Sequence, residues 1–361
     1  MRKSVLFRKI LLLLILQLSL MAVTAQHRLF LLHPTADNIE NMLTMIRLKV
    51  IDIPDLEMVG VYHEKEAYNY QESEKYLKDN HVAHYTLMKI SGELNVQNIY
   101  RENDCTPAFK KIVQEADAIL FFGGPDIQPA LYGEKQHLLT DVTDPNRHLM
   151  ESSFLFHLMG GSRNPGFQPL LLQKPDLIVR GFCLGMQTMN VAAGGTLIQD
   201  IPQEVYHVST AEGMLAIDAK NRHHNYHSQL NPGCDISWGL LHPIRPVPQK
   251  YLYELCQGTG QQQPWVWSSH HQAIGRLGAN LEVIATSMDG KIIEAVRHKI
   301  FKGVIGVQFH PEQAMLYLPG SRFLNTPADN YSPNEQLLKE KSMDFHLKYW
   351  KEFSEEVKRI K

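Results

Sequence analysis

The segment at residues 180–187 (RGFCLGMQ) constrains the fold of this chain most, because it predicts a sharp turn between a strand and a helix. It follows the apolar run at residues 177–179 (LIV) and holds Cys183 between Gly181 and Gly185. On such a turn the central residue takes a strained backbone conformation and its side chain stands above the sheet edge. Glycine on both sides lets neighbouring backbone pass. The segment predicts a thiol nucleophile, although a lone cysteine is most often a small buried apolar residue.

A second segment supports the nucleophile. A strand-like run at residues 303–309 ends in His310, 127 residues after Cys183, and Glu312 follows two positions later. A third apolar run, at residues 117–122, ends in a glycine pair at residues 123–124. The carboxyl ends of parallel strands share one edge of the sheet, where ligands bind, so the three segments are expected to meet there.

The three segments supply what acyl transfer to a thiol requires. His310 would take the thiol proton and later donate it to the leaving amine, and Glu312 would orient the imidazole ring. The backbone N–H groups of Gly124 and Leu184 would hold the oxyanion. The start of the helix after Cys183 and a nearby imidazole both favour the thiolate.

Strands alternate with helices along most of the chain, which predicts a mainly parallel sheet covered on both faces. Further strands are predicted at residues 28–32, 56–62, 82–88, 281–287 and 291–297, and helices at residues 38–48, 71–78, 107–116 and from Cys183 to about Ala193. Residues 201–265 are mixed. Residues 316–333 resemble a linker, and an amphipathic helix with apolar positions from Met343 to Val357 follows.

The motifs around Cys183, His310 and Glu312 resemble the class I glutamine amidotransferase fold and its Cys-His-Glu triad. The segments at residues 123–133 (GGPDIQPALYG), 190–200 (NVAAGGTLIQD) and 268–274 (SSHHQAI) further resemble the γ-glutamyl-γ-aminobutyrate hydrolase branch of cysteine peptidases. The resemblance implies a flavodoxin-like, three-layer α/β fold with small antiparallel additions. It also implies that the enzyme hydrolyses γ-glutamyl amides.

The resemblance assigns substrate-binding roles as well. Gln187 matches a glutamine beside the bound glutamyl group, and His270, His271 and Gln272 are implied to line or support the substrate cleft. Two positions depart from the branch. Leu184 stands where an arginine is usual, and Trp267 replaces an asparagine, which leaves the amine side of the substrate open.

Residues 1–25 predict a secretory signal peptide, with four basic residues, an apolar core and a small-residue end. Residues 26–325 are then the hydrolase domain, and residues 326–361 are the linker and a C-terminal helix packed on it. Removing the leader changes the formal net charge from −2 to −6, which argues against a nucleic-acid partner. The expectation is an exported, periplasmic or secreted protein without a transmembrane segment after cleavage, and a homodimer stays open.

The histidine and cysteine content predicts neither a metal site nor a disulfide framework. The histidines His223, His224 and His227, with His270 and His271, have no cysteine or carboxylate at ligand spacing, so no metal and no other cofactor is expected. With Cys183 as a free nucleophile, Cys105, Cys234 and Cys256 allow at most one disulfide.

Three alternatives to the γ-glutamyl hydrolase remain open at this point. A glutaminase that passes ammonia to a synthetase would need a partner domain. A poly-γ-glutamate (folate) hydrolase would use the same triad. A non-catalytic binding module on this fold would not need the intact residues Cys183, His310 and Glu312.

Overall fold

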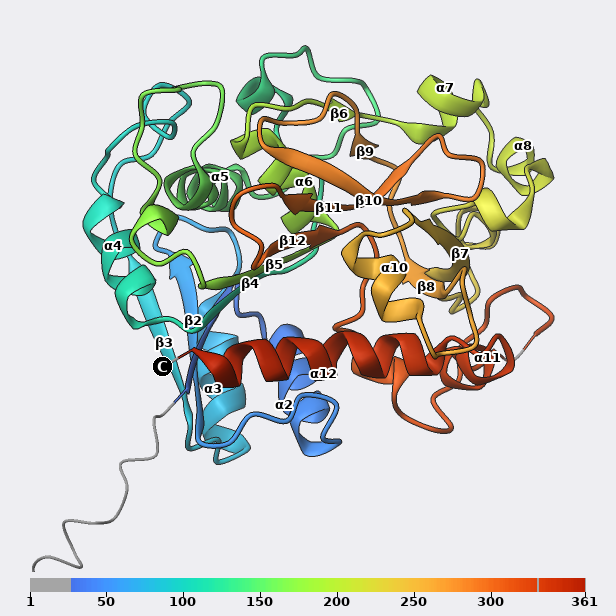
Figure 1. Ribbon diagram of the computed structural model, residues 1–361. Coiled ribbons are helices and arrows are strands. Elements are labelled where there is room, and N and C mark those ends of the chain that lie inside the picture. Colours follow the sequence, from blue (N-terminus) through green and yellow to red (C-terminus); the bar gives the residue numbers. More distant parts are fainter. Residues whose placement is uncertain (1–26, 330, 361) are drawn as a thin grey trace, which may run out of the picture.

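A ten-stranded mixed sheet organises the computed structural model, which describes residues 27–329 and 331–360 (Figure 1). Its strand order is β3-β2-β1-β4-β5-β12-β11-β10-β7-β8, and a separate pair is formed by β6 and β9. The strands are β1 (His27–Leu32), β2 (Leu56–His63), β3 (Tyr85–Ile90), β4 (Ala118–Phe121), β5 (Ile178–Phe182), β6 (Leu197–Ile198), β7 (Leu240–Pro246), β8 (Trp265–Ser268), β9 (Ala273–Ile274), β10 (Leu281–Ser287), β11 (Ile293–His298) and β12 (Val304–Val307).

The first six strands in this order are parallel, and β11, β10, β7 and β8 extend the sheet in antiparallel pairs. The α-helices are α2 (Ala36–Arg47), α3 (Tyr70–Asp79), α4 (Thr106–Glu115), α5 (Pro145–Met159), α6 (Leu184–Ala192), α7 (Ile201–Tyr206), α8 (Ala211–Ala216), α9 (His227–Leu230), α10 (Tyr251–Cys256), α11 (Pro333–Lys339) and α12 (Met343–Arg359). Short 3-10 turns are η1 (Pro129–Tyr132), η2 (Leu170–Leu172), η3 (Ala219–Asn221) and η4 (Ala314–Leu316).

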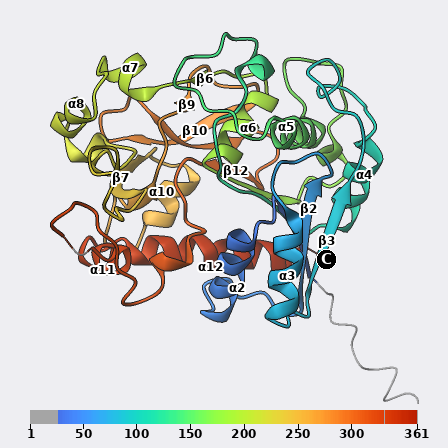
Figure 2. The same ribbon diagram turned by 180° about the vertical axis from the view of Figure 1, so that it is seen from behind.

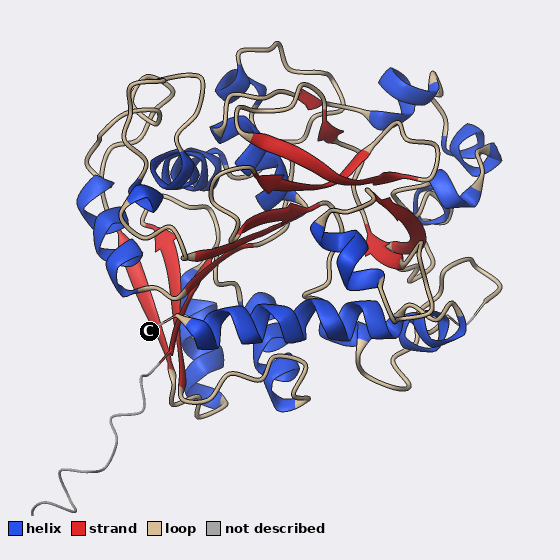
Figure 3. Ribbon diagram, in the orientation of Figure 1, coloured by secondary structure: helices blue, strands red, loops and turns tan. Residues whose placement is uncertain are grey.

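Helices cover both faces of the sheet, as Figures 2 and 3 show. One apolar core lies between the sheet and α4, α5 and α6, and the other between the sheet and α2, α3, α10, α11 and α12. Along β4, Ile119 and Phe121 face the first core, whereas Ala118 and Leu120 face the second. This alternation is what a strand buried on both faces requires. The predicted three-layer α/β fold with antiparallel additions is confirmed.

The predicted elements agree with the structure to within a few residues, but α5 was not predicted. Asp144 caps its start by accepting from the N–H of Arg147, and the chain leaves the helix at Gly160, where φ is +72°. Almost all of α5 is buried, so its sequence lacks the polar face that marks a surface helix. The mixed region at residues 201–265 forms α7–α10, β7 and β8.

Some expectations concern other parts of the chain. The predicted signal peptide at residues 1–25 lies outside the described residues. At the other end, α12 buries Phe345, Trp350 and Phe353 against the sheet. All four cysteines are unpaired. Within the described ranges, the structure contains no helix that combines the length and the apolar character needed to cross a bilayer.

Candidate active site

Cys183 lies on the turn between β5 and α6, in a backbone conformation that few residues adopt. Its φ is +50° and its ψ is −105°, and its N–H donates to the carbonyl of Val307 at 2.8 Å. A positive φ on a residue with a side chain stores strain and persists only when the surroundings hold it. The side chain is buried, with the residue 5% exposed. The turn therefore fixes the sulfur at the carboxyl edge of the sheet.

The two flanking glycines are required by backbone packing. A Cβ atom on Gly181 would lie 2.7 Å from the carbonyl carbon of Gly185, and a Cβ on Gly185 would lie 2.3 Å from the carbonyl oxygen of Phe121. Both distances are too short for real atoms. The GFCLG motif therefore has glycine at both positions because α6 packs closely over β4 and β5.

His310 and Glu312 lie beyond the end of β12, the strand next to β5. Nδ1 of His310 lies 2.7 Å from Oε1 of Glu312, and both side chains are buried. Burial opposes protonation of the imidazole, but the charge of Glu312 and the interactions with Glu312 and Cys183 outweigh it and raise the pKa of His310 to about 10. The ring is therefore positively charged at neutral pH and forms an ion pair with Glu312.

Gly123 brings the third strand end against the other two. A Cβ on Gly123 would lie 2.4 Å from Cε1 of His310 and 3.5 Å from Cβ of Cys183. The carboxyl ends of β4, β5 and β12 therefore meet, as the sequence predicts, because these strands are parallel neighbours. This contact leaves no room for a side chain at position 123.

Arg147 of α5 holds the glycine turn, and the sequence interpretation missed it. Its guanidinium is fully buried and donates to the carbonyls of Phe122 and Gly123 at 2.9 and 3.0 Å, while Nε donates to Glu151 at 2.7 Å. In a trans peptide the N–H points away from the C=O, so the N–H of Gly124 faces away from Arg147. The arginine thereby orients the backbone donor expected at Gly124.

Gln308, Gln187 and Gln272 form a chain of polar contacts that starts at the cysteine. Nε2 of Gln308 lies 3.5 Å from Sγ of Cys183, and Oε1 of Gln308 faces Nε2 of Gln187 at 3.4 Å. Nε2 of Gln187 also donates to the carbonyl of Gln272 at 3.2 Å. The side chain of Gln272 donates to the carbonyl of Gln199 at 3.2 Å. Gln308 was not predicted; it lies in a bend directly after the end of β12.

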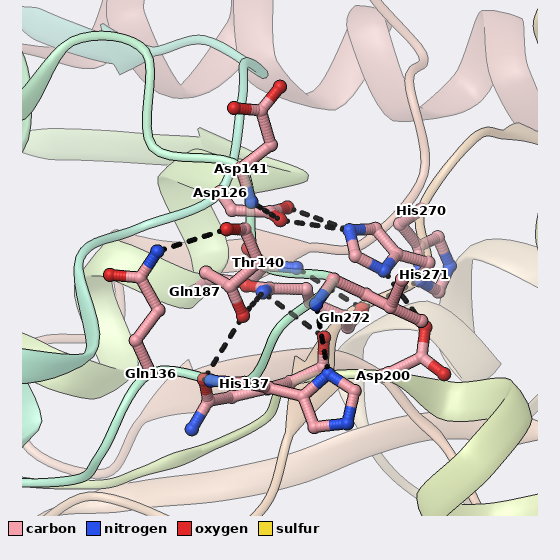
Figure 4. A network of polar contacts seen from close by, with 12 residues as sticks. Asp126, Gln136, His137, Thr140, Asp141, Gln187, Asp200, His270, His271 and Gln272 are labelled. Atoms are coloured by element: carbon pink, nitrogen blue, oxygen red, sulfur yellow. Dashed lines mark hydrogen bonds and ion pairs between the residues drawn. The ribbon is translucent and has the colours of Figure 1, made fainter.

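His271 joins two carboxylates, as Figure 4 shows. Its Nε2 lies 2.9 Å from Asp126 and its Nδ1 lies 3.1 Å from Asp200. Burial opposes the charge, but the hydrogen bonds and charges of Asp126 and Asp200 prevail and raise the pKa of His271 to about 9. Asp126 follows the glycine turn by two residues, so this charged group lies on the same segment as the candidate oxyanion donors. Neither aspartate was singled out from the sequence.

The remaining predicted histidines separate in space. His270 turns into the protein, where its Nδ1 donates to the carbonyl of Gln272 at 2.9 Å and its ring lies 5.0 Å from the ring of His223. His224 contacts the hydroxyl of Ser269 at 2.9 Å. His227 begins the short helix α9. The five histidines therefore do not form one cluster.

Two cavities adjoin these groups. One of about 490 Å³ is lined by Gly123, Gly124 and Trp238, together with polar residues of α2 that include Asp37 and Glu40. The other, of about 400 Å³, is lined by His271 and Asp200 and by residues of α7 and α8. The first touches the glycine turn, where Gly123 lies beside Cys183 and His310. Trp238, which is 44% exposed, lies edge-on to His310 with ring centroids 5.5 Å apart.

A cysteine on a strand-to-helix turn of this α/β sheet defines a class of cysteine hydrolases and amidotransferases. The sequence model of the family "Peptidase C26" matches residues 57–312, and the chain belongs to that family.

Proteins similar to this chain carry related names. The "Putative glutamine amidotransferase-like protein YvdE" of Lactococcus lactis is 29% identical over 58% of this chain and 71% of that protein. The "Putative glutamine amidotransferase Rv2859c" of Mycobacterium tuberculosis is 31% identical over 56% of this chain and 53% of that protein. A crystal structure of a glutamine amido transferase from Methylobacillus flagellatus is 13% identical, with a TM-score of 0.37 over 82% of this chain and 94% of that one. Membership of the family and the names of the relatives from Lactococcus lactis and Mycobacterium tuberculosis support a cysteine hydrolase or amidotransferase type of activity.

Proposed function

We propose that this protein hydrolyses γ-glutamyl amides through a glutamyl-thioester on Cys183. The observation that carries the proposal is the meeting of three strand ends, which combines a strained cysteine, an ion-paired histidine and a glycine turn held by a buried arginine. Each part matches one requirement of acyl transfer: a nucleophile, a proton donor and acceptor, and backbone N–H groups for the oxyanion.

The mechanism follows from the charge of His310. The Cys183 thiolate attacks the γ-carbonyl carbon, and the negative charge on its oxygen is held by the N–H groups of Gly124 and Leu184. Imidazolium His310 then protonates the amine nitrogen, the C–N bond breaks and the amine leaves. Neutral His310 next accepts a proton from the water that attacks the thioester. The C–S bond then breaks, Cys183 leaves as the thiolate, and the γ-carboxyl group of the released glutamate loses its proton to solvent, which restores the starting thiolate and imidazolium. The net reaction consumes one water for each amide, and Glu312 stabilises the imidazolium in the charged states.

The polar groups around the cysteine suit a glutamyl head group, which carries a carboxylate and an ammonium. Imidazolium His271 lies between Asp126 and Asp200, so these three side chains together carry one negative charge, which suits the ammonium group. Gln187 and Gln308 present amide groups beside the reacting centre. We assign the glutamyl side to these residues.

The cavity beside the glycine turn supports an amine product larger than ammonia. Its volume of about 490 Å³ exceeds what ammonia needs. Arg147 also lines the cavity, but its charge is paired with Glu151, so Asp37 and Glu40 leave the wall negative and favour amines that carry a positive charge. A glutaminase remains the second candidate because relatives of this chain are named as glutamine amidotransferases. A poly-γ-glutamate substrate would place carboxylates in the same cavity, against these two acids. We also propose that residues 1–25 act as a signal peptide that directs export of the enzyme.

The test is an assay of purified protein with γ-glutamyl anilide, γ-glutamyl diamines, γ-glutamyl-glutamate and glutamine, with release of glutamate as the readout. We expect turnover of the amides, preference for the diamine conjugates, and loss of activity in Cys183→Ala. Cys234→Ala serves as the matched control, because that cysteine is exposed and lies outside the site. Equal glutamate release by Cys183→Ala, or turnover of none of the compounds, would end the proposal. Turnover of glutamine alone would favour the glutaminase.

A further inference from the structure

We infer that the protein binds one divalent transition-metal ion, of the Zn²⁺ type, at a buried cluster away from Cys183. The cluster consists of His223, His242, His270 and Glu294, and one ligand atom from each lies within 4.8 Å of the others. All four residues are at most 5% exposed. They come from the loop after η3, from β7, from the loop after β8 and from β11. The inference does not depend on the proposed γ-glutamyl substrate.

The polar atoms of the cluster lack the partners that a buried position demands. Within the described residues, neither ring nitrogen of His223, nor Nε2 of His270, nor either carboxylate oxygen of Glu294 has a hydrogen-bond partner. The closest approach, 3.1 Å between Nδ1 of His223 and Oε1 of Glu294, is an ion-pair distance without the geometry of a hydrogen bond. A buried carboxylate without compensation is strongly destabilising. A bound cation would compensate it.

The hydrogen bonds around the cluster orient the ring nitrogens as metal ligands are oriented. His270 directs Nδ1 to the carbonyl of Gln272 at 2.9 Å, which leaves the lone pair of Nε2 free. Nδ1 of His242 lies 3.2 Å from the carbonyl of Pro243, and its Nε2 faces the hydroxyl of Ser268 at 2.8 Å. That hydroxyl is the one competing partner, and Ser268 must change its χ1 rotamer to move the oxygen away before Nε2 of His242 binds an ion.

The donor set identifies the chemical class of the ion. Three imidazoles and one carboxylate suit Zn²⁺ or a similar ion, whereas Mg²⁺ and Ca²⁺ prefer oxygen ligands alone. Four protein ligands and nearly complete burial indicate a closed, structural site. The expectation of no metal relied on the absence of a carboxylate at ligand spacing, but the fold brings Glu294 from a distant strand.

The cluster also supports the residues that contact the candidate nucleophile. The carbonyl of Gln272 accepts from both His270 and Gln187. The carbonyl of Glu294 accepts from the N–H of Gln308 at 2.8 Å, and the side chain of Gln308 contacts Cys183. An ion at the cluster would therefore stiffen the backbone behind both glutamines.

The experiment measures metal content and stability in full-length protein that carries Cys183→Ser and Cys234→Ser, because these changes remove a reactive and an exposed thiol as competing ligands. After dialysis against chelator, Zn²⁺ or Co²⁺ is added back and excess ion is removed. We expect about one ion per chain and a rise in Tm of several degrees with Zn²⁺. The Co²⁺ form should show visible absorption without a thiolate charge-transfer band.

Two variants and a control localise the ion. Glu294→Gln and His242→Gln should lose the bound ion and the shift in Tm, whereas His227→Gln, in the same region but outside the cluster, should keep both. Less than about a tenth of an ion per chain, or undiminished binding by folded Glu294→Gln, overturns the inference. If the variants do not fold, anomalous diffraction at the zinc edge from crystals of the Zn²⁺-loaded protein decides. A peak among the four side chains supports the site, and its absence there overturns it.

Discussion

Nδ1 of His310 lies 2.7 Å from Oε1 of Glu312, in a buried pair at the carboxyl end of β12. Oε2 of the same carboxylate has no hydrogen-bond partner in the described part of the chain. The negative charge of Glu312 is therefore directed mainly at the imidazole ring. The carboxylate is therefore the main group that stabilises the positive charge on His310.

Glu312→Gln should reduce kcat by a factor on the order of 10³ while the protein stays folded, because the amide cannot stabilise an imidazolium. Steady-state kinetics with a γ-glutamyl anilide and circular dichroism measure the two effects. Glu335→Gln, an exposed glutamate on α11, is the control and should leave kcat unchanged. A Glu312→Gln enzyme with wild-type kcat would remove this residue from the mechanism.

The pH dependence should follow the raised pKa of His310, which is about 10. Because the protonated ring donates to the leaving amine, kcat/KM should fall as the pH rises through about 10. The charge on His310 also stabilises the folded protein, and this contribution likewise falls as the pH rises. It is complete below the unfolded-state pKa of about 6.5 and is lost as the pH passes the folded-state value. Glu312→Gln should move the alkaline limb to lower pH, and an unmoved limb would contradict the assignment.

Gly123→Ala should abolish most of the activity and lower the free energy of unfolding by about 1–3 kcal/mol, because the new methyl group would lie 2.4 Å from Cε1 of the buried His310 and would displace the ring. Gly166→Ala is the matched control, since the nearest atom to a Cβ at that position is 4.0 Å away. Thermal unfolding and kcat of both variants provide the comparison. Full activity in Gly123→Ala would show that the activity does not depend on the observed position of the His310 ring.

Arg147→Met should lower the free energy of unfolding by about 3–5 kcal/mol, because it leaves Glu151 buried without its partner. The double variant Arg147→Met with Glu151→Met should recover much of that stability. Its kcat should nevertheless stay low, since the carbonyls of Phe122 and Gly123 still lack their donor. Urea denaturation and kinetics separate the two effects. Recovery of kcat together with stability would mean that the arginine is purely structural.

Trp238→Ala should raise KM roughly tenfold, which corresponds to the loss of about 1.4 kcal/mol of binding. The indole is partly exposed and lines the cavity beside the glycine turn, so the fold should tolerate its removal. Trp238→Phe keeps an aromatic ring and should remain close to wild type. An unchanged KM in Trp238→Ala with the largest amides would exclude contact with the amine side.

Local sequence was sufficient for the fold class and for the edge of the sheet where the candidate site lies. Apolar runs and helical periodicity depend on neighbouring residues, so they predicted the strands next to Cys183, Gly123 and His310. The helix α5 was not predicted because it is buried on nearly all sides and its sequence has no polar face. Arg147, which lies on α5, was missed with it.

The sequence by itself determined the turn at Cys183, because only glycine fits the close backbone passages on both sides of that residue. It also determined the two-residue spacing of His310 and Glu312, although a turn at residues 311–312, and not the extended chain that was expected, brings the two side chains together. The tertiary structure alone decided which histidines meet. His223, His242, His270 and Glu294 converge only through the pairing of β7 with β8 and β10 and of β10 with β11, and such long-range pairing leaves no local pattern in the chain.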